Sequence, residues 1–242
     1  MKPEGLVLIN NEGLRTDGRA PNELRKTEII LGYLKHANGS VYYKQGNTKI
    51  VAAVFGPSEA HPRHLALPDR AILRVRYHMA PFSVEERKSP APTRREVELS
   101  MVIRNALEPI VISELFPKTL IDVFIEVIQA DGGTRGAGVT AAALALADAG
   151  IPLRSLVAAC AAGKVDGRVV LDLNDLEDKY GEADMPVAYL PTLNKISLLQ
   201  MDGKMRIDEF KEALSIAING CMMLYQTQVG SIRNKYMLED QG

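Results

Sequence analysis

The sequence has no tryptophan and only two cysteines among its 242 residues. Cys160 and Cys221 both lie in apolar surroundings, which excludes a disulfide framework and indicates a reducing compartment. The longest apolar run covers residues 139–147 and ends at Asp148, whereas a membrane span needs ~18–20 such residues. The first residues also lack the basic segment and the apolar stretch of a signal peptide. We therefore expect a soluble, cytoplasmic protein with no membrane partner.

The sequence also lacks several catalytic motifs, and each missing motif argues against a type of reaction. No cysteines and histidines have zinc-ligand spacing, no Gly-x-Ser-x-Gly elbow is present, and the four histidines do not pair with a plausible nucleophile. Hydrolysis through a covalent intermediate or a zinc ion is therefore disfavoured. The formal net charge of −1 excludes a generally polybasic surface, so a polyanion would have to bind to a local basic patch.

The apolar pattern predicts an α+β protein, because strand-like runs and helical spacing both occur along the chain. No linker, low-complexity segment or internal repeat is present. We therefore expect a single domain with mixed sheets and packed helices over residues 1–242, with an irregular arm over 1–14 and a flexible tail over 230–242. The expected strands cover residues 27–34, 40–43, 48–55, 72–79, 120–129, 157–165, 168–173, 187–191 and 195–200; the expected helices cover 95–115, with a break at Pro109, an alanine-rich segment ending near 149, and 206–229.

A glycine-rich segment, Asp131–Gly138, joins a predicted strand to a predicted helix. Backbone N–H groups at a helix start bind anions, and glycines let the anion approach the backbone closely. Arg135 adds a planar, permanent charge that matches phosphate, and Thr134 adds a hydroxyl. The glycine spacing fits neither a P-loop nor a dinucleotide fingerprint. A plain turn, in which Arg135 pairs with a carboxylate, is an equally weighted alternative.

Two aspartates in an acidic segment form a second candidate. Asp178 and Asp184 are separated by an expected turn, and Asp184 comes directly before an expected strand over 185–190. Two nearby carboxylates can divide acid–base and metal-binding work between them. On pattern alone, a solvated acidic loop is the favoured interpretation.

Basic residues outnumber acidic ones between Arg63 and Arg104. Arg94 and Arg95 stand at an expected helix N-terminus, where cations are disfavoured by the helix dipole. An anion bound there would offset that cost, although two surface arginines are an equal alternative. A separate loop carries Arg63 and His64 and could touch a polyanion far from the chemistry.

Several of these motifs together resemble one family. The segment Gln129–Arg135 resembles the phosphate-binding turn of the RNase PH family, the phosphate-dependent 3′→5′ exoribonucleases. Asp178 with Asp184 is similar to the catalytic acidic pair of that family, and Arg15–Arg19 matches its N-terminal signature. The pattern extends over residues from about 15 to 228. Within the family, three segments look like the branch formed by the catalytic subunit of the archaeal exosome: Met79–Lys88, Thr93–Glu96 and Gly181–Pro186.

The resemblance implies the RNase PH fold, which is like domain 2 of ribosomal protein S5. It also implies a hexameric ring of three heterodimers with a related non-catalytic subunit, and RNA-binding cap subunits on one face. Inorganic phosphate would be the co-substrate, with Mg²⁺ as a further ion, and nucleoside diphosphates would be released from RNA 3′ ends. The reaction could also run in reverse as RNA tailing. The implied catalytic residues are Asp178 and Asp184, which could also hold the metal; the implied phosphate-binding residues are Gly133, Thr134, Arg135 and Gly136; and the implied RNA-binding residues are Arg94, Arg95, Arg63 and His64.

Three alternatives to this function are considered. The chain could be a stand-alone homohexamer that trims tRNA 3′ ends. It could instead be a ring subunit that only binds RNA, although an inert subunit has no need of Arg135, Asp178 and Asp184 together. A small-molecule kinase of similar topology is disfavoured, because the glycine turn lacks the serine-rich pattern of such kinases.

Overall fold

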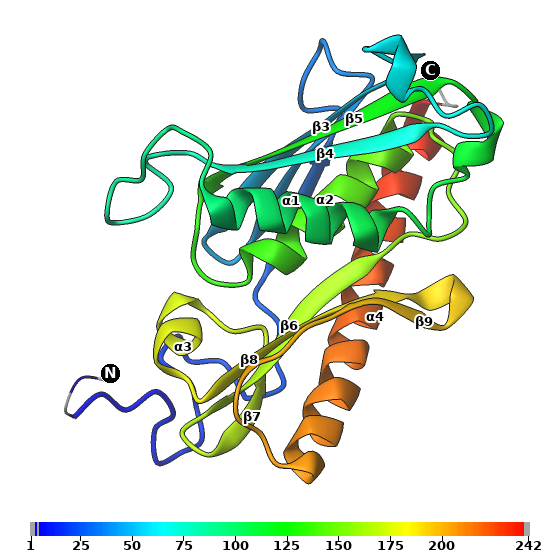
Figure 1. The fold of residues 1–242 in the computed structure, drawn as a ribbon. Coiled ribbons are helices and arrows are strands. Elements are labelled where there is room, and N and C mark those ends of the chain that lie inside the picture. Colours follow the sequence, from blue (N-terminus) through cyan, green and yellow to red (C-terminus); the bar gives the residue numbers. More distant parts are fainter. Residues whose placement is uncertain (1–2, 4, 240–242) are drawn as a thin grey trace.

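The computed structural model describes residue 3 and residues 5–239, and in them two five-stranded sheets combine with four α-helices (Figure 1). The predicted α+β class is therefore confirmed. The strands are β1 (Thr27–Leu31), β2 (Gly39–Gln45), β3 (Thr48–Glu59), β4 (Ile72–Met79), β5 (Thr119–Gln129), β6 (Ala158–Val165), β7 (Arg168–Leu171), β8 (Ala183–Leu190), β9 (Lys195–Leu199) and β10 (Asp202–Gly203). The helices are α1 (Arg94–Leu107), α2 (Thr134–Asp148), α3 (Asp175–Tyr180) and α4 (Ile207–Glu239), with short 3-10 turns at Arg63–Leu65, Ser113–Leu115 and Pro191–Leu193.

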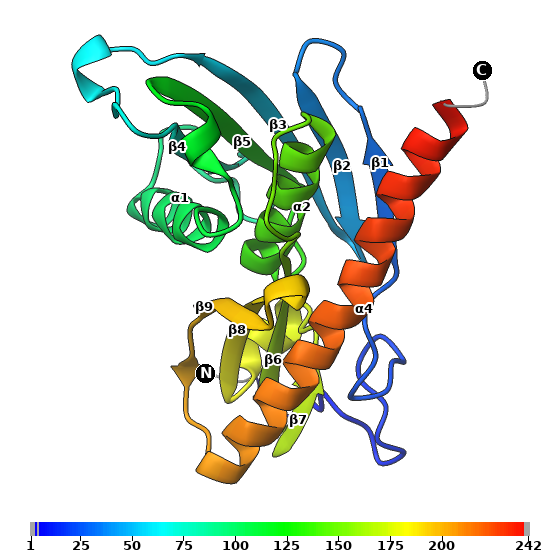
Figure 2. The same ribbon diagram turned by 90° about the vertical axis from the view of Figure 1, so that its right-hand side faces the viewer.

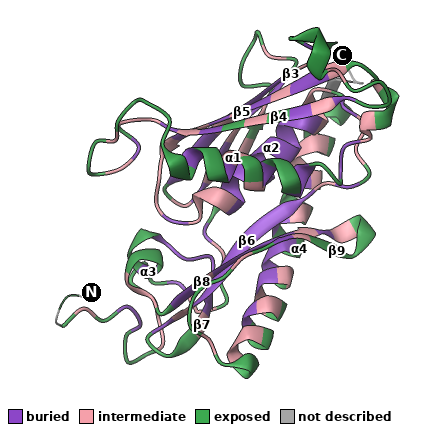
Figure 3. Ribbon diagram, in the orientation of Figure 1, coloured by how far each residue is buried: buried purple, intermediate pink, exposed green. Residues whose placement is uncertain are grey.

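The first sheet has the order β1-β2-β3-β5-β4, in which only β4 and β5 run parallel. Its apolar face packs on α1 and α2, and α2 is buried along most of its length (Figure 3). Alanines and glycines on α2 permit this close packing. A Cβ on Gly39 would lie 2.2 Å from the backbone nitrogen of Ala149, so β2 requires glycine at that contact. Because its small residues allow this close packing, α2 is fixed with its N-terminus at the centre of the molecule.

The second sheet has the order β10-β8-β6-β7, with β9 also paired to β8. Helix α4 covers one face of it and continues upward to reach β1 of the first sheet (Figure 2). Small buried residues such as Ala213, Ala217 and Cys221 line the contact between α4 and this sheet. Cys160 and Cys221 are both free and buried.

Several boundaries differ from the sequence predictions. Helix α1 ends at Leu107, before Pro109, so the expected helix over 95–115 is a shorter helix followed by a 3-10 turn. Strand β3 continues to Glu59, into the expected loop. Helix α4 extends to Glu239, so residues 230–239 of the expected flexible tail are helical; residues 240–242 lie outside the described part of the chain. The extension is supported by Lys235, whose Nζ lies 2.7 Å from Oδ1 of Asp148.

The arm before β1 has turns and one isolated bridge, between Ile9 and Arg15. It is fastened to the second sheet by Asp166, whose Oδ2 accepts hydrogen bonds from the backbone N–H groups of Leu8 and Ile9 at 2.8 and 3.2 Å. None of the helices in the described residues combines the length and the apolar character that a bilayer span requires.

Candidate active site

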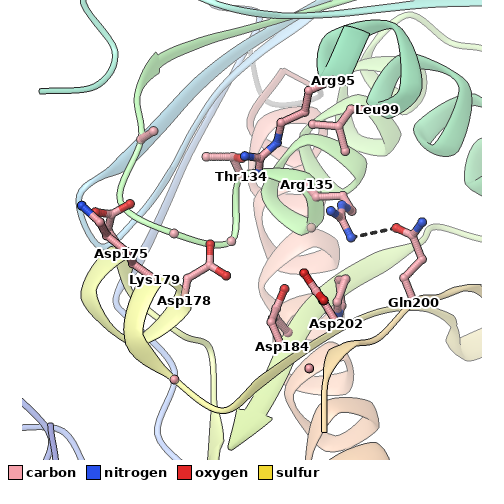
Figure 4. A pocket seen from close by; sticks show the side chains of 18 of the residues that line it. Arg95, Leu99, Thr134, Arg135, Asp175, Asp178, Lys179, Asp184, Gln200 and Asp202 are labelled. Atoms are coloured by element: carbon pink, nitrogen blue, oxygen red, sulfur yellow. Dashed lines mark hydrogen bonds between the residues drawn. The ribbon is translucent and has the colours of Figure 1, made fainter. Parts of the chain in front are cut away.

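A cavity of about 600 Å³ lies between the first turns of α1 and α2 on one side and the second sheet with α3 on the other. Figure 4 shows Arg95, Thr134 and Arg135 on one wall and Asp178 and Asp184 on the facing wall. The predicted glycine turn and the predicted acidic pair therefore share one cleft. Gly133 and Gly136 line it as well.

The glycine turn is held in a conformation that suits anion binding. Gly132 and Gly133 have φ of 69° and 64°, and a Cβ on Gly132 would lie 2.5 Å from the backbone carbon of Asn174. Thr48 fixes the turn, since its hydroxyl donates to the Gly132 carbonyl at 2.9 Å and accepts from the N–H of Asp131 at 3.1 Å. Among the residues that the structure describes, no side chain caps the N-terminus of α2. The first N–H groups of α2 thus lack a side-chain acceptor and are suited to bind a ligand oxygen.

Thr134 is oriented by a buried tyrosine. The hydroxyl of Tyr77 donates to Oγ1 of Thr134 at 2.9 Å. Burial raises the pKa of Tyr77 to about 12, so its hydroxyl keeps its proton at neutral pH. Because the Thr134 oxygen already accepts this bond, its own proton is available to donate to a ligand in the cavity.

Arg135 is not paired with a carboxylate, which contradicts the plain-turn alternative. Its Nη1 donates to Oε1 of Gln200 at 2.7 Å. Among the described residues, no Asp or Glu oxygen lies within an ion-pair distance of 4.0 Å from its guanidinium. The charge on Arg135 is therefore available to an anion.

The start of α1 has its own caps. The Thr93 hydroxyl accepts from the N–H of Glu96, and the Glu96 carboxylate accepts from the N–H of Thr93, which forms a capping box. Glu96 thus already places a negative charge in the first turn beside Arg94 and Arg95, and an anion bound to these arginines stays a prediction. Arg95 nevertheless lines the cavity, whereas the exposed Arg94 does not.

Asp178 is carried by α3, a helix that the sequence analysis did not predict. Asn174 begins this helix with a capping box to Glu177. Glu177 is fully buried and forms an ion pair with Arg15, whose Nε lies 2.7 Å from Oε1. The turn expected between the two aspartates is thus the end of a helix, and the buried neighbour Glu177 holds Asp178 toward the cavity.

Asp184 lies within β8 rather than before it, and is paired in register with Asp202 of β10. Burial, and then the negative charge of Asp178, raise the pKa of Asp184 to about 7. Desolvation by the cavity walls also raises the pKa of Asp178, against the opposing charge of Arg95. Asp178 is exposed, so water screens part of this effect. The pair therefore holds a proton more readily than ordinary carboxyl groups do.

The structure adds cavity residues that the sequence analysis missed. Gln200 and Asp202 come from the short connection after β9 and from β10, a strand of two residues. Lys179 and Asp175 enter with α3. No pattern in the sequence marks these positions, since Gln200 and Asp202 depend on the pairing of β9 and β10 with β8, and Lys179 and Asp175 depend on the placement of α3.

The remaining predicted residues lie elsewhere. Arg63 and His64 form the exposed 3-10 turn between β3 and β4, outside the cavity, and Arg63 pairs with Glu59 at 2.9 Å. Both the distance of these residues from the chemistry and their contact with RNA stay predictions. Within the described ranges, no group of three or more His, Cys, Asp or Glu side chains is arranged to hold a metal ion.

Comparison with known proteins gives a consistent result. Two models of the 3′ exoribonuclease family match the chain, domain 1 over residues 23–152 and domain 2 over residues 155–220. The chain is 63% identical over 236 residues to the exosome complex component Rrp41 of Pyrococcus abyssi, covering 98% of this chain and 95% of that protein. It is 57% identical over 229 residues to the protein of the same name from Methanopyrus kandleri, covering 95% and 96%.

Solved structures show the same fold. The crystal structure of rice (Oryza sativa) Rrp46 matches with a TM-score of 0.78 at 26% identity, covering 88% of this chain and 98% of that one. The Archaeoglobus fulgidus exosome with RNA bound to the active site matches with a TM-score of 0.76 at 24% identity, covering 89% and 93%. The basic wall of the cavity falls in the first family region, and its acidic wall falls in the second.

Proposed function

The chain belongs to the RNase PH, or 3′ exoribonuclease, family, and from this premise we propose that it is the catalytic subunit of an archaeal exosome that shortens RNA by phosphorolysis. The observation that carries the proposal is the single cavity in which Arg95 and Arg135 face Asp178 and Asp184. The high identity to archaeal exosome components over nearly the whole chain supports the same assignment. The kinase alternative has no support from the family match.

Phosphorolysis requires two anions to meet. Inorganic phosphate carries about −1.5 to −2 charge at neutral pH, and the RNA diester carries −1. Positioning and neutralisation of charge are therefore the main contributions that a protein can make. The N–H groups at the start of α2, with Thr134 and Arg135, would hold the attacking phosphate. Arg95 would hold the scissile diester beside it, and the exposed Arg94 would bind the RNA backbone further out.

The acidic wall would complete the reaction. An oxygen of phosphate attacks the last phosphorus of the chain, the bond to the 3′ oxygen breaks, and a nucleoside 5′-diphosphate leaves. The 3′ oxygen of the shortened RNA needs a proton, which the Asp178–Asp184 pair can donate because its pKa is raised. The same carboxylates suit Mg²⁺, which commonly takes one or two carboxylates together with substrate phosphates and would neutralise charge on them. Reversal with nucleoside diphosphates would lengthen RNA.

The proposed assembly is a ring of three heterodimers with a related non-catalytic subunit, capped by RNA-binding subunits. Large apolar side chains exposed on α1 support a protein partner, since Val97 and Met101 are 64% and 52% exposed. In such a ring, Arg63 and His64 would contact RNA on its way to the cavity.

The test is to mix the chain with its candidate ring partner and to follow diphosphate release from poly(A) with and without phosphate. We expect release only when phosphate is present. Degradation at the same rate without phosphate would exclude phosphorolysis. A stable, active homohexamer of the lone chain on gel filtration would favour the stand-alone tRNA-trimming alternative. Binding without degradation would indicate a ring subunit that only binds RNA.

A further inference from the structure

Gln200 holds the guanidinium of Arg135. Its Oε1 accepts the hydrogen bond from Nη1 at 2.7 Å, and both side chains lie at the edge of the cavity (Figure 4). The backbone of Gln200 is itself fixed, since its N–H donates to the Pro186 carbonyl at 3.2 Å. The glutamine therefore presents a stationary acceptor to a long, flexible side chain that comes from the other half of the molecule.

The partner of Arg135 differs in charge from the partners of the buried arginines. Arg15 pairs with Glu177, and Arg25 pairs with Asp172 at 2.7 Å. In both, a carboxylate neutralises the guanidinium. Arg135 has an uncharged amide instead, and its Nε is buried without a hydrogen-bond partner among the described residues. The hydrogen bond to Gln200 is thus the one that fixes this guanidinium within the described structure.

An uncharged partner for Arg135 matters because the facing wall of the cavity is acidic. The charge of Arg135 acts on both Asp178 and Asp184, and lowers the pKa of each against the effect of burial. Both aspartates and Asp202 lie across the same cavity. A guanidinium free to rotate could form a direct ion pair with one of them, because Arg–carboxylate pairs are strong when partly desolvated. Such an ion pair would neutralise the charge of Arg135, and it would also keep the paired aspartate from holding a proton.

We propose that Gln200 is a positioning residue for phosphate: it fixes the guanidinium of Arg135 without neutralising its charge and keeps it apart from the aspartates. The inference rests on the proposed phosphorolytic function. According to this proposal, the required group is the side-chain amide of Gln200, and a residue of similar size without an amide would not replace it. A glutamate at this position would keep the shape and the acceptor but would neutralise the arginine, and a methionine would keep the shape without the acceptor.

The experiment measures phosphorolysis in the reconstituted ring as a function of phosphate and of RNA concentration. For Gln200→Met we expect the KM for phosphate to rise on the order of tenfold, the size of one lost hydrogen bond to a charged group. For Gln200→Glu we expect a rise as well, because the carboxylate would neutralise the charge of Arg135. The KM for RNA should be unchanged in both variants. Gln226→Met, on the exposed face of α4 outside this cavity, is the matched control and should leave both constants unchanged.

A double-mutant cycle separates positioning from a structural role. In an Arg135→Lys background, Gln200→Met should raise the KM for phosphate much less than it does in the unmodified chain, since the guanidinium it holds is gone. An equal effect in both backgrounds would overturn the proposal, as would an unchanged phosphate KM in Gln200→Met. If the unmodified ring instead degrades RNA without phosphate, the proposed function itself is wrong, and the two failures are therefore distinguishable.

Discussion

Arg15, in the arm before the first strand, forms a fully buried ion pair with Glu177, the residue directly before Asp178. Arg15 also donates to the carbonyl of Asp172 at 2.8 Å, while Arg25 pairs with the side chain of Asp172. The N-terminal signature segment therefore supports the acidic wall of the cavity from behind. Arg15 thus stabilises α3 through Glu177.

Glu177→Gln should lower the free energy of unfolding by about 3–5 kcal/mol, because it leaves the buried Arg15 charge without its carboxylate. Urea unfolding followed by circular dichroism would measure this. The matched control is Asp69→Asn, which breaks an exposed pair with Arg70 and should have no measurable effect. Equal stability of Glu177→Gln and the unmodified chain would show that the pair does not anchor α3.

Asp178→Asn should reduce the rate of RNA degradation by the ring about 10²–10⁴-fold, the usual contribution of a general acid. RNA binding, measured by fluorescence anisotropy, should persist, because the substitution removes no positive charge. Asp208→Asn, at the exposed start of α4, is the control. A parallel loss of binding and of activity would assign Asp178 a structural role.

Arg135→Ala should raise the KM for phosphate by more than it raises the KM for RNA. The reason is that Arg135 lies beside the N-terminus of α2, while Arg95 remains for the RNA diester. Steady-state kinetics at varied phosphate and varied RNA would separate the two constants. Arg104→Ala, on the exposed side of α1, should change neither. If the RNA constant alone moves, the glycine turn is not the phosphate site.

Asp184 gives the stability of the chain a pH dependence with a definite sign. Its pKa rises from an ordinary value of 3.8 to about 7 in the folded chain. Its contribution to stability is therefore fully present below pH 3.8, and is lost as the pH rises toward 7 and the buried group must ionise. Asp184→Asn should remove this loss.

The measurement is the melting temperature of the isolated chain between about pH 4 and pH 8. Relative to the unmodified chain, Asp184→Asn should gain stability as the pH rises, by about 2–4 °C at the upper end of this range, which corresponds to ~1 kcal/mol after allowance for solvent at the cavity. A melting-temperature difference that stays constant over this range would mean that Asp184 ionises at its ordinary pKa.

Local signals in the sequence predicted most of the fold, and the resemblance predicted the core of the site. Strand β4 is found with the predicted bounds, because the alternation of apolar and polar residues is a local property. The glycine turn is equally local, since its positive-φ residues must be glycines. Asp178, Asp184 and Arg135 were all predicted from motifs in the sequence.

The rest depends on contacts between distant segments. Helix α3 has only six residues and is stabilised by Arg15, more than 150 positions away in the chain. Asp202 and Gln200 enter the cavity only because β10 and β9 pair with β8. The extra length of α4 depends on Asp148, at the end of α2, which Lys235 contacts. No short window of sequence contains both partners of any of these interactions.

The two walls of the cavity come from separate parts of the sequence. Arg95, Thr134 and Arg135 precede Asp178, Asp184 and Gln200 along the chain. The residues that would hold phosphate therefore all lie before Gly150, and the residues that would donate the proton all lie after it. Under the proposed function, the cavity can act only when both halves of the chain are folded against each other.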